Sequence, residues 1–219
     1  MNRMVNDLLE WKGPKDGPFQ IYQGDSRGPI EAIKPHSASV IITSPPYPNE
    51  KDYTRTTRLE SVILDLIRNK GELKSLKRSL VRSNTRNVYS SDTNELYVES
   101  IEEIQRIANE IEARRIEMGK TSGFERMYHR VARHYFGGMA RHLQEMKRIL
   151  KPGAYLAYVV GDQASYLQVM IRTGDLLSEV AESLGYKVIR KDLFRTRFAT
   201  ATKQQIREEV VIFQWKGEK

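Results

Sequence analysis

The chain of 219 residues contains no cysteine and only four histidines. Disulfide bonds and thiolate-bound metals are therefore excluded, and a zinc enzyme is disfavoured. No apolar run approaches the roughly 20 residues that a membrane-spanning helix requires. The first residues, MNRMVNDLLEWKG, do not have the apolar stretch of a signal peptide. We therefore expect a cytoplasmic protein that holds no metal and does not contact a membrane.

The composition is that of a globular protein, with 39% hydrophobic and 29% charged residues. The length fits one domain, with room for an insertion. The net charge of +8 favours a polyanionic partner, because each phosphate contact made by Lys or Arg releases counterions. Charge alone leaves open whether the partner is a nucleic acid or whether there is no specific partner.

Two strand-like runs open the chain, at 19–25 (FQIYQGD) and 39–44 (SVIITS). Both are rich in β-branched or aromatic residues, and both end in turn-forming residues. The segment IEAIK at 30–34 fits the helical crossover of a parallel sheet. Over 56–150 the apolar residues recur three or four apart instead, which predicts three or four amphipathic helices.

The last third of the chain returns to strands. Pro152 and Gly153 are expected to stop a helix and start a buried strand, and a further helix is expected over 165–186. Two final strands, YKVIRKDLFRT and EEVVIFQWK, predict a long hairpin. The pattern is that of an open α/β sheet with an antiparallel last strand. In such sheets ligands bind beyond the carboxyl ends of the strands.

The tetrad Ser44-Pro45-Pro46-Tyr47 follows the second of these strands. Two prolines fix two φ angles and remove two N–H donors, so the chain after Ser44 is rigid and presents carbonyl acceptors. Tyr47 adds an aromatic face, and Ser44 adds a hydroxyl. The exocyclic amino group of a flipped nucleobase needs such acceptors beside an aromatic face. The alternative is a tight proline turn with a core tyrosine.

The residues TSPPY resemble motif IV of the AdoMet-dependent amino-methyltransferases of DNA. The run from IYQGDSR to SVIITSPPY, and the segments DYTRTTRLE, GFERMYHRVARHYFGGMARHLQEMKRILKPGAYLAYVVGD and EEVVIFQWK, are also similar to bacterial DNA modification methylases. The resemblance implies a partial Rossmann-like sheet containing strands 3 to 7 of that fold. It implies a catalytic half-domain at 1–55 and 124–219, and a helical insertion at 56–123 that contacts DNA or recognises the target.

By this resemblance the catalytic residues are Ser44, Pro45, Pro46 and Tyr47, and a leading serine goes more often with cytosine N4 than with adenine N6. Hydrogen bonds from the amino group to Ser44 and to the Pro45 carbonyl would favour a nucleophilic nitrogen placed for in-line attack. The implied cofactor is S-adenosyl-L-methionine (AdoMet), and its expected contacts are Gly24, Asp25, Thr43 and Asp162. The alternatives are a simple loop role for Asp25 and a helix N-cap role for Asp162.

The family binds AdoMet with a glycine-rich loop that resembles DPFxGxG, and neither this loop nor the acid after the second strand is found. Gly13 and Gly17 lie in a proline-containing lead-in, and Gly137 and Gly138 lie in a predicted helix. A sheet without its first two strands would expose an edge. We therefore expect a partner chain that carries the loop. A truncated gene and a self-paired homodimer are the alternatives.

Double-stranded DNA is the expected substrate, although a noncatalytic DNA-binding or assembly subunit and an RNA base amino-methyltransferase stay open. A binding module has no need of the whole tetrad, which favours the enzyme. The three histidines at 129, 134 and 142 are read as structural or close to DNA, since their spacing does not suit a metal. Solvated surface is the alternative for the candidate DNA contacts, which are Arg55, Arg58, Lys74, Lys77, Arg78, Arg82, Arg195, Arg197 and Lys203.

Overall fold

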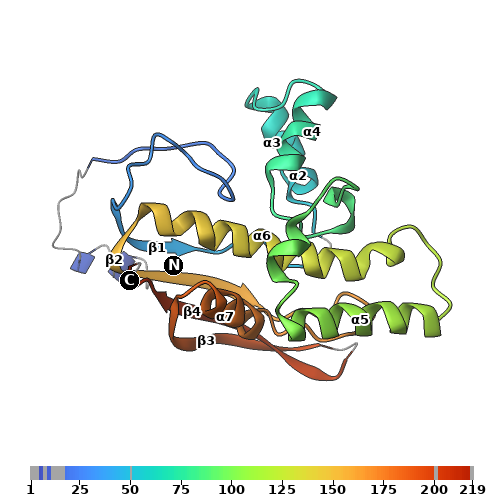
Figure 1. The fold of residues 1–219 in the computed structure, drawn as a ribbon. Coiled ribbons are helices and arrows are strands. Elements are labelled where there is room, and N and C mark those ends of the chain that lie inside the picture. Colours follow the sequence, from blue (N-terminus) through green and yellow to red (C-terminus); the bar gives the residue numbers. More distant parts are fainter. Residues whose placement is uncertain (1–4, 7–8, 11–17, 50, 200–201, 218–219) are drawn as a thin grey trace.

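The computed structural model describes residues 5–6, 9–10, 18–49, 51–199 and 202–217. Gly13 and Gly17, which were considered above for a cofactor loop, lie outside the described residues. One four-stranded sheet forms the base of the molecule, and helices pack over it (Figure 1). None of the described helices combines the length and the apolar character needed to cross a bilayer.

The sheet has the strand order β1-β2-β4-β3. Strand β1 is parallel to β2, whereas β4 is antiparallel to both β2 and β3. The predicted mixed α/β sheet with an antiparallel last strand and a terminal hairpin is therefore confirmed. The bounds are β1 Ala38–Thr43, β2 Leu150–Gly161, β3 Lys187–Ala199 and β4 Gln204–Gln214.

The strand predicted at 19–25 is wrong: this segment forms no strand, and Phe19 and Ile21 are exposed. A strand needs a neighbour for its backbone hydrogen bonds, and the described residues place none beside this segment. The sheet therefore has four strands and not the five that the resemblance implied. The crossover helix predicted at 30–34 is also wrong, because turns occupy those residues.

Helices dominate the region 56–150, as predicted, but five α-helices replace the three or four expected, and residues 80–101 contain only short 3₁₀ turns. Its α-helices are α2 Tyr53–Thr56, α3 Arg58–Ile63, α4 Lys70–Ser79, α5 Glu102–Glu117 and α6 Tyr128–Ile149. The 3₁₀ turns are η1 Thr85–Asn87, η2 Asn94–Val98 and η3 Glu125–Met127. Gly137 and Gly138 lie inside α6, as expected.

Two predicted boundaries near β2 are corrected. Strand β2 starts before Pro152 and Gly153, directly after α6, and Gly153 takes a positive φ of 85° within it. The helix expected over 165–186 is only α7 Thr173–Ser183. A β-bridge between Gln163 and Ile171 occupies the preceding segment and replaces its first turns.

The core lies between the helices and one face of the sheet. Side chains of α5, α6, β2 and β4 share it, among them Ile111, Tyr135, Leu156 and Phe213, which are fully buried. Because α5 packs into this core, the second part of the expected insertion is continuous with the main body. The division of the chain at 56 and 123 remains a prediction.

Helices α2, α3 and α4 (residues 53–79, here called the arm) stand away from the sheet in Figure 1. Among the residues of the arm, Ile67 is the one large apolar side chain that is buried. The following residues 80–87, here called the return segment, lead the chain back to the body. Beyond them, η2 touches α6 so closely that a Cβ on Gly137 would lie 1.8 Å from the Asn94 carbonyl oxygen. Only glycine fits there.

Candidate active site

The turn at 44–47 begins directly after Thr43, the last residue of β1. It therefore lies at the carboxyl end of the parallel pair β1 and β2, where α/β sheets bind ligands. Ser44 is exposed, and Pro45 and Pro46 are half-buried. Cavities border the turn on two sides, so its hydroxyl and carbonyl groups lie next to open space.

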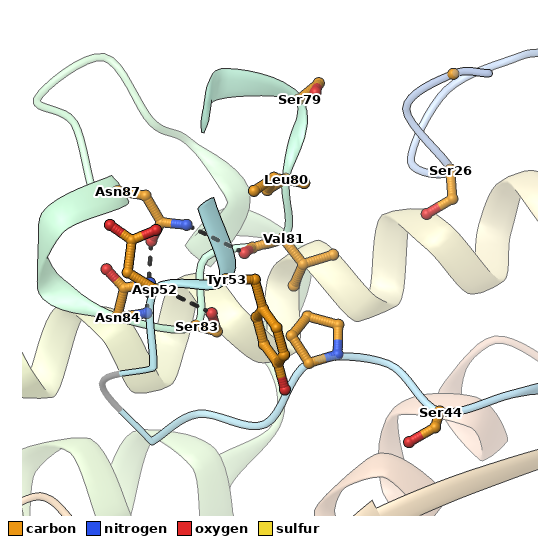
Figure 2. Close-up of a pocket in the computed structure, with 12 residues that line it drawn as sticks. Ser26, Ser44, Asp52, Tyr53, Ser79, Leu80, Val81, Ser83, Asn84 and Asn87 are labelled. Carbon is orange, nitrogen blue, oxygen red and sulfur yellow. Dashed lines mark hydrogen bonds between the residues drawn. The ribbon is translucent and has the colours of Figure 1, made fainter. Parts of the chain in front are cut away.

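The larger cavity, here called the arm cavity, measures about 370 Å³. Its walls are the loop at 24–26, the turn and its continuation to Tyr53, and the end of α4 with the return segment. Figure 2 shows Asp52, Ser83, Asn84 and Asn87 grouped on one side of Tyr53, with Ser44 and Ser26 on the other. The cavity thus has a polar wall, an aromatic wall and the turn.

The second cavity, here called the strand cavity, measures about 330 Å³ and lies against the end of β1. Thr43 and Ser44 line it together with His142 of α6. The His142 ring lies 3.1 Å from the Ser26 carbonyl oxygen through Nδ1 and 2.6 Å from the Tyr158 hydroxyl through Nε2. Burial lowers the pKa of His142, so the neutral ring donates to Ser26 and accepts from Tyr158.

All three histidines of α6 have structural contacts in protein. His129 lies 3.1 Å from Glu112, and His134 contacts Glu95. Among the described residues no group of side chains has the arrangement of a metal site.

Tyr47 does not line the arm cavity and lies instead beside residues of the β3–β4 hairpin. Its ring touches Gly161, where an added Cβ would approach Cε2 to 3.2 Å. Its hydroxyl lies 3.3 Å from Glu208 Oε1, and Arg195 pairs with the same carboxylate. Burial raises the pKa of Tyr47, whereas the hydrogen bond from Arg195 lowers the pKa of Glu208. The sequence pattern did not indicate that Gly161 and Glu208 contact Tyr47.

The return segment holds the chain that follows the turn. The Ser83 carbonyl accepts hydrogen bonds from Asn49 N and from the Tyr166 hydroxyl, both at 3.1 Å. Asn84, which is 1% exposed, donates from Nδ2 to the Lys51 carbonyl at 3.2 Å. Sequence reasoning missed this contact. The asparagine before a short helix indicates a cap, and Asn84 does accept from Arg86 N, but its link to Lys51 is tertiary.

Asp52 connects the turn to the arm. Its carboxylate lies 2.9 Å from Lys77 Nζ and accepts the Thr54 hydroxyl at 2.6 Å. Burial acts to raise the pKa of Asp52, but the hydrogen bonds from Lys77 and Thr54 outweigh it and lower the pKa. Lys77, expected at the DNA surface, is therefore engaged inside the protein.

Arg82 is likewise not placed as expected. Its side chain is buried and pairs with both carboxylate oxygens of Asp92 at 2.8 Å. One guanidinium nitrogen also donates to the carbonyls of residues 77, 78 and 80. We therefore remove Arg82 and Lys77 from the set of DNA contacts. Lys74 and Arg78 are exposed on the same helix.

Two expected cofactor residues already have protein partners. The Asp25 carboxylate accepts from Arg27 Nε at 2.9 Å and from Nη2 at 2.6 Å. Burial acts to raise the pKa of Asp25, but the hydrogen bonds from Arg27 outweigh it, so the pKa is lowered. Asp25 thus acts as a loop acceptor for Arg27, while its neighbour Gly24 lines the arm cavity.

Asp162 is completely buried and lines neither cavity. Its carboxylate pairs with Arg172 at 2.6 Å and with Arg207 at 2.9 Å. The alternative of a helix N-cap is wrong, because the N-cap of α7 is Arg172, ten residues later in the chain. Cofactor binding by Asp162 stays a prediction. Arg172 and Arg207 would first have to move away from its carboxylate.

The chain is similar to Type II methyltransferases. It is 31% identical over 195 residues to Type II methyltransferase M.AvaI of Nostoc sp. (strain PCC 7120 / SAG 25.82 / UTEX 2576), covering 84% of this chain and 38% of the relative. The M.AvaI of Anabaena variabilis gives the same values. Type II methyltransferase M.BsoBI of Geobacillus stearothermophilus is 27% identical over 217 residues, covering 87% of this chain and 40% of the relative.

The chain thus spans about two fifths of the length of these relatives. No protein-family model matches it. Among solved structures, a chain from Thermus thermophilus described as a DNA modification methylase aligns with a TM-score of 0.42 at 14% identity. That alignment covers 90% of this chain and 52% of the other.

The remaining basic residues lie on two surfaces near the turn. Arg55 is exposed on α2, and Arg58 is half-buried, with its Nε donating to the Thr54 carbonyl at 2.9 Å. In the hairpin, Arg197 and Lys203 are exposed, and Arg195 stays largely exposed although it pairs with Glu208. Whether any of them contacts DNA remains a prediction.

Proposed function

We propose that this chain forms the catalytic part of a DNA methyltransferase that transfers a methyl group from AdoMet to an exocyclic amino group. The observation that carries the proposal is the turn at 44–47, placed at the carboxyl end of β1 between two cavities, in a chain 31% identical to a Type II methyltransferase. Because Ser44 leads the turn, cytosine N4 is favoured over adenine N6 as the target.

The residues of the turn position the amino group. The Ser44 hydroxyl and the Pro45 carbonyl accept hydrogen bonds from its two N–H groups, which favours a more tetrahedral nitrogen whose lone pair is less delocalised into the ring. Two prolines keep these acceptors fixed, so little reorganisation is needed during the reaction. AdoMet supplies a methyl group on a positively charged sulfur. The site therefore contributes orientation and charge placement, without a covalent nucleophile.

The described residues fit only one side of the cofactor. Thr43 and Ser44 offer hydroxyls at the strand cavity, but the Asp25 carboxylate is held by Arg27. We propose that the glycine loop belongs to a second protein chain. The position of strand β1 supports this proposal. It lies at the edge of the sheet, and its side chains Val40 and Ile42 are exposed. A homodimer is the alternative arrangement.

Double-stranded DNA is the proposed substrate, and its phosphates would lie along the two exposed basic surfaces. Phosphate contacts supply most of the sequence-independent affinity for DNA. The residues proposed for these contacts are Arg55, Arg58, Lys74, Arg78, Arg195, Arg197 and Lys203.

The test measures transfer of tritium from labelled AdoMet to bacterial genomic DNA, which requires no knowledge of the recognition sequence. The chain is assayed alone and together with the portion of M.AvaI that lies outside the matched 38%. Mass spectrometry of the digested DNA is expected to show N4-methylcytosine, and Ser44→Ala should abolish it. Methyl groups found only in added RNA, or on a ring carbon of cytosine, would refute the proposal.

A further inference from the structure

Two tyrosines flank the turn, and their surroundings differ. Tyr47 is enclosed by Gly161 and Glu208, and the space beside it measures only about 10 Å³. Such a volume holds at most one water molecule. Tyr53 is 47% exposed and lines the arm cavity of about 370 Å³. This volume is in the range of small-molecule sites. In this structure only the second tyrosine has room beside it for a planar ring.

Tyr53 also shares its cavity with the groups proposed to hold the amino nitrogen. Ser44 and Pro46 line the arm cavity, and Tyr47 does not. In Figure 2 the Tyr53 ring extends from the start of α2 toward the turn. A base whose amino group reaches Ser44 from the arm cavity therefore lies beside the ring of Tyr53.

The polar wall of the arm cavity supports Tyr53 from behind. Asp52, Ser83, Asn84 and Asn87 give it carboxylate, hydroxyl and amide groups. Internal contacts fix this wall, since Asp52 pairs with Lys77 at 2.9 Å. In Figure 2 the residues of this wall lie on the side of Tyr53 away from Ser44. They therefore hold the start of α2 in place, and the face of Tyr53 toward Ser44 stays available to a base.

We propose that the arm cavity receives the target base and that Tyr53 is the aromatic residue against which the base stacks. The proposal rests on the proposed function. It reassigns the stacking role expected of Tyr47, which instead keeps the turn in place through Glu208. The arm thereby forms part of the base pocket, in addition to any contact it makes with phosphates.

The test uses a single-stranded oligonucleotide that carries one 2-aminopurine, whose fluorescence is quenched when it stacks on an aromatic ring. The isolated chain should quench it, and Tyr53→Phe should retain the effect. Tyr53→Ala and Tyr53→Leu should weaken the quenched complex roughly 5- to 150-fold, which corresponds to the 1–3 kcal/mol of one base–aromatic stack. The leucine variant keeps apolar bulk without a ring.

Tyr97→Ala is the matched control, because Tyr97 is 53% exposed and lies over Arg141, away from the arm cavity. An oligonucleotide with an abasic site in place of 2-aminopurine should bind all variants equally, which separates stacking from phosphate contact. The inference is overturned if wild type does not quench, if Tyr53→Ala quenches like wild type, or if only Tyr47→Ala loses the effect. Failure of the methylation assay would speak against the proposed function and leaves this result intact.

Discussion

Replacing Asn84 with alanine should loosen the chain just beyond the turn while leaving the sheet unchanged. The side chain accepts from Arg86 N at 3.0 Å and donates to the Lys51 carbonyl at 3.2 Å, and the residue is 1% exposed. Each such bond contributes about 0.5–1.5 kcal/mol, so losing both costs about 1–3 kcal/mol. That cost corresponds to roughly 5- to 150-fold in a local opening equilibrium.

Hydrogen exchange followed by mass spectrometry measures this opening directly. Peptides covering 47–54 should exchange faster in Asn84→Ala, whereas peptides within 154–160 of β2 should keep their wild-type rates. Asn69→Ala provides the matched control, since Asn69 caps α4 by accepting from Glu72 N at 3.0 Å and touches no part of the turn. It should lose about 1 kcal/mol of stability without changing exchange at 47–54.

Two outcomes would refute this reasoning. If exchange at 47–54 is the same in Asn84→Ala and wild type, the return segment does not hold the turn. If β2 loosens as much as 47–54, the substitution destabilises the whole protein and the effect is not local.

Tyr47→Phe and Glu208→Gln should each reduce methylation modestly, and the double variant should add little, because both remove the same hydrogen bond; additive effects would disprove the link. The folded-state pKa of Asp52 is lowered, so its contribution to stability is present above its unfolded pKa and is lost as the pH falls through the folded value. Urea unfolding between pH 7 and pH 3 should show this loss, and Asp52→Asn should flatten it. Changing Lys74 and Arg78 together to Ala should reduce the slope of log affinity against log salt by up to about 2, while an unchanged slope would mean that this face is only solvated.

The parts of the fold that local pattern determines were predictable. The alternation and β-branched content of β1 and the hairpin, and the apolar spacing of α6, each specify one element without outside help. The segment at 19–25 has an equally strong strand pattern, yet no strand forms there. Strand formation depends on a neighbour, which no property of the segment itself can supply.

The sequence predicts where the turn lies in the sheet, but not how the side chains around it are oriented. The sequence places Ser44 at a strand end, but it does not say which way each tyrosine faces. Tyr47 turns toward Glu208, 161 residues later in the chain, whereas Tyr53 lines the arm cavity. The same limit applies to the basic residues of α4. Lys77 lies inward because it pairs with Asp52, which is 25 residues away in the sequence.

Gly137 limits how the arm can move, because this residue has no side chain to separate α6 from the chain that follows the arm. The Asn94 carbonyl rests directly on the backbone of α6 at this point, so the chain leaving the arm is pinned and cannot act as a hinge. Any swing of the arm on DNA binding must therefore be taken up before this joint, in the residues around Leu80 where α4 ends. The hinge would then lie next to the arm cavity, and opening the arm would also open the proposed base pocket.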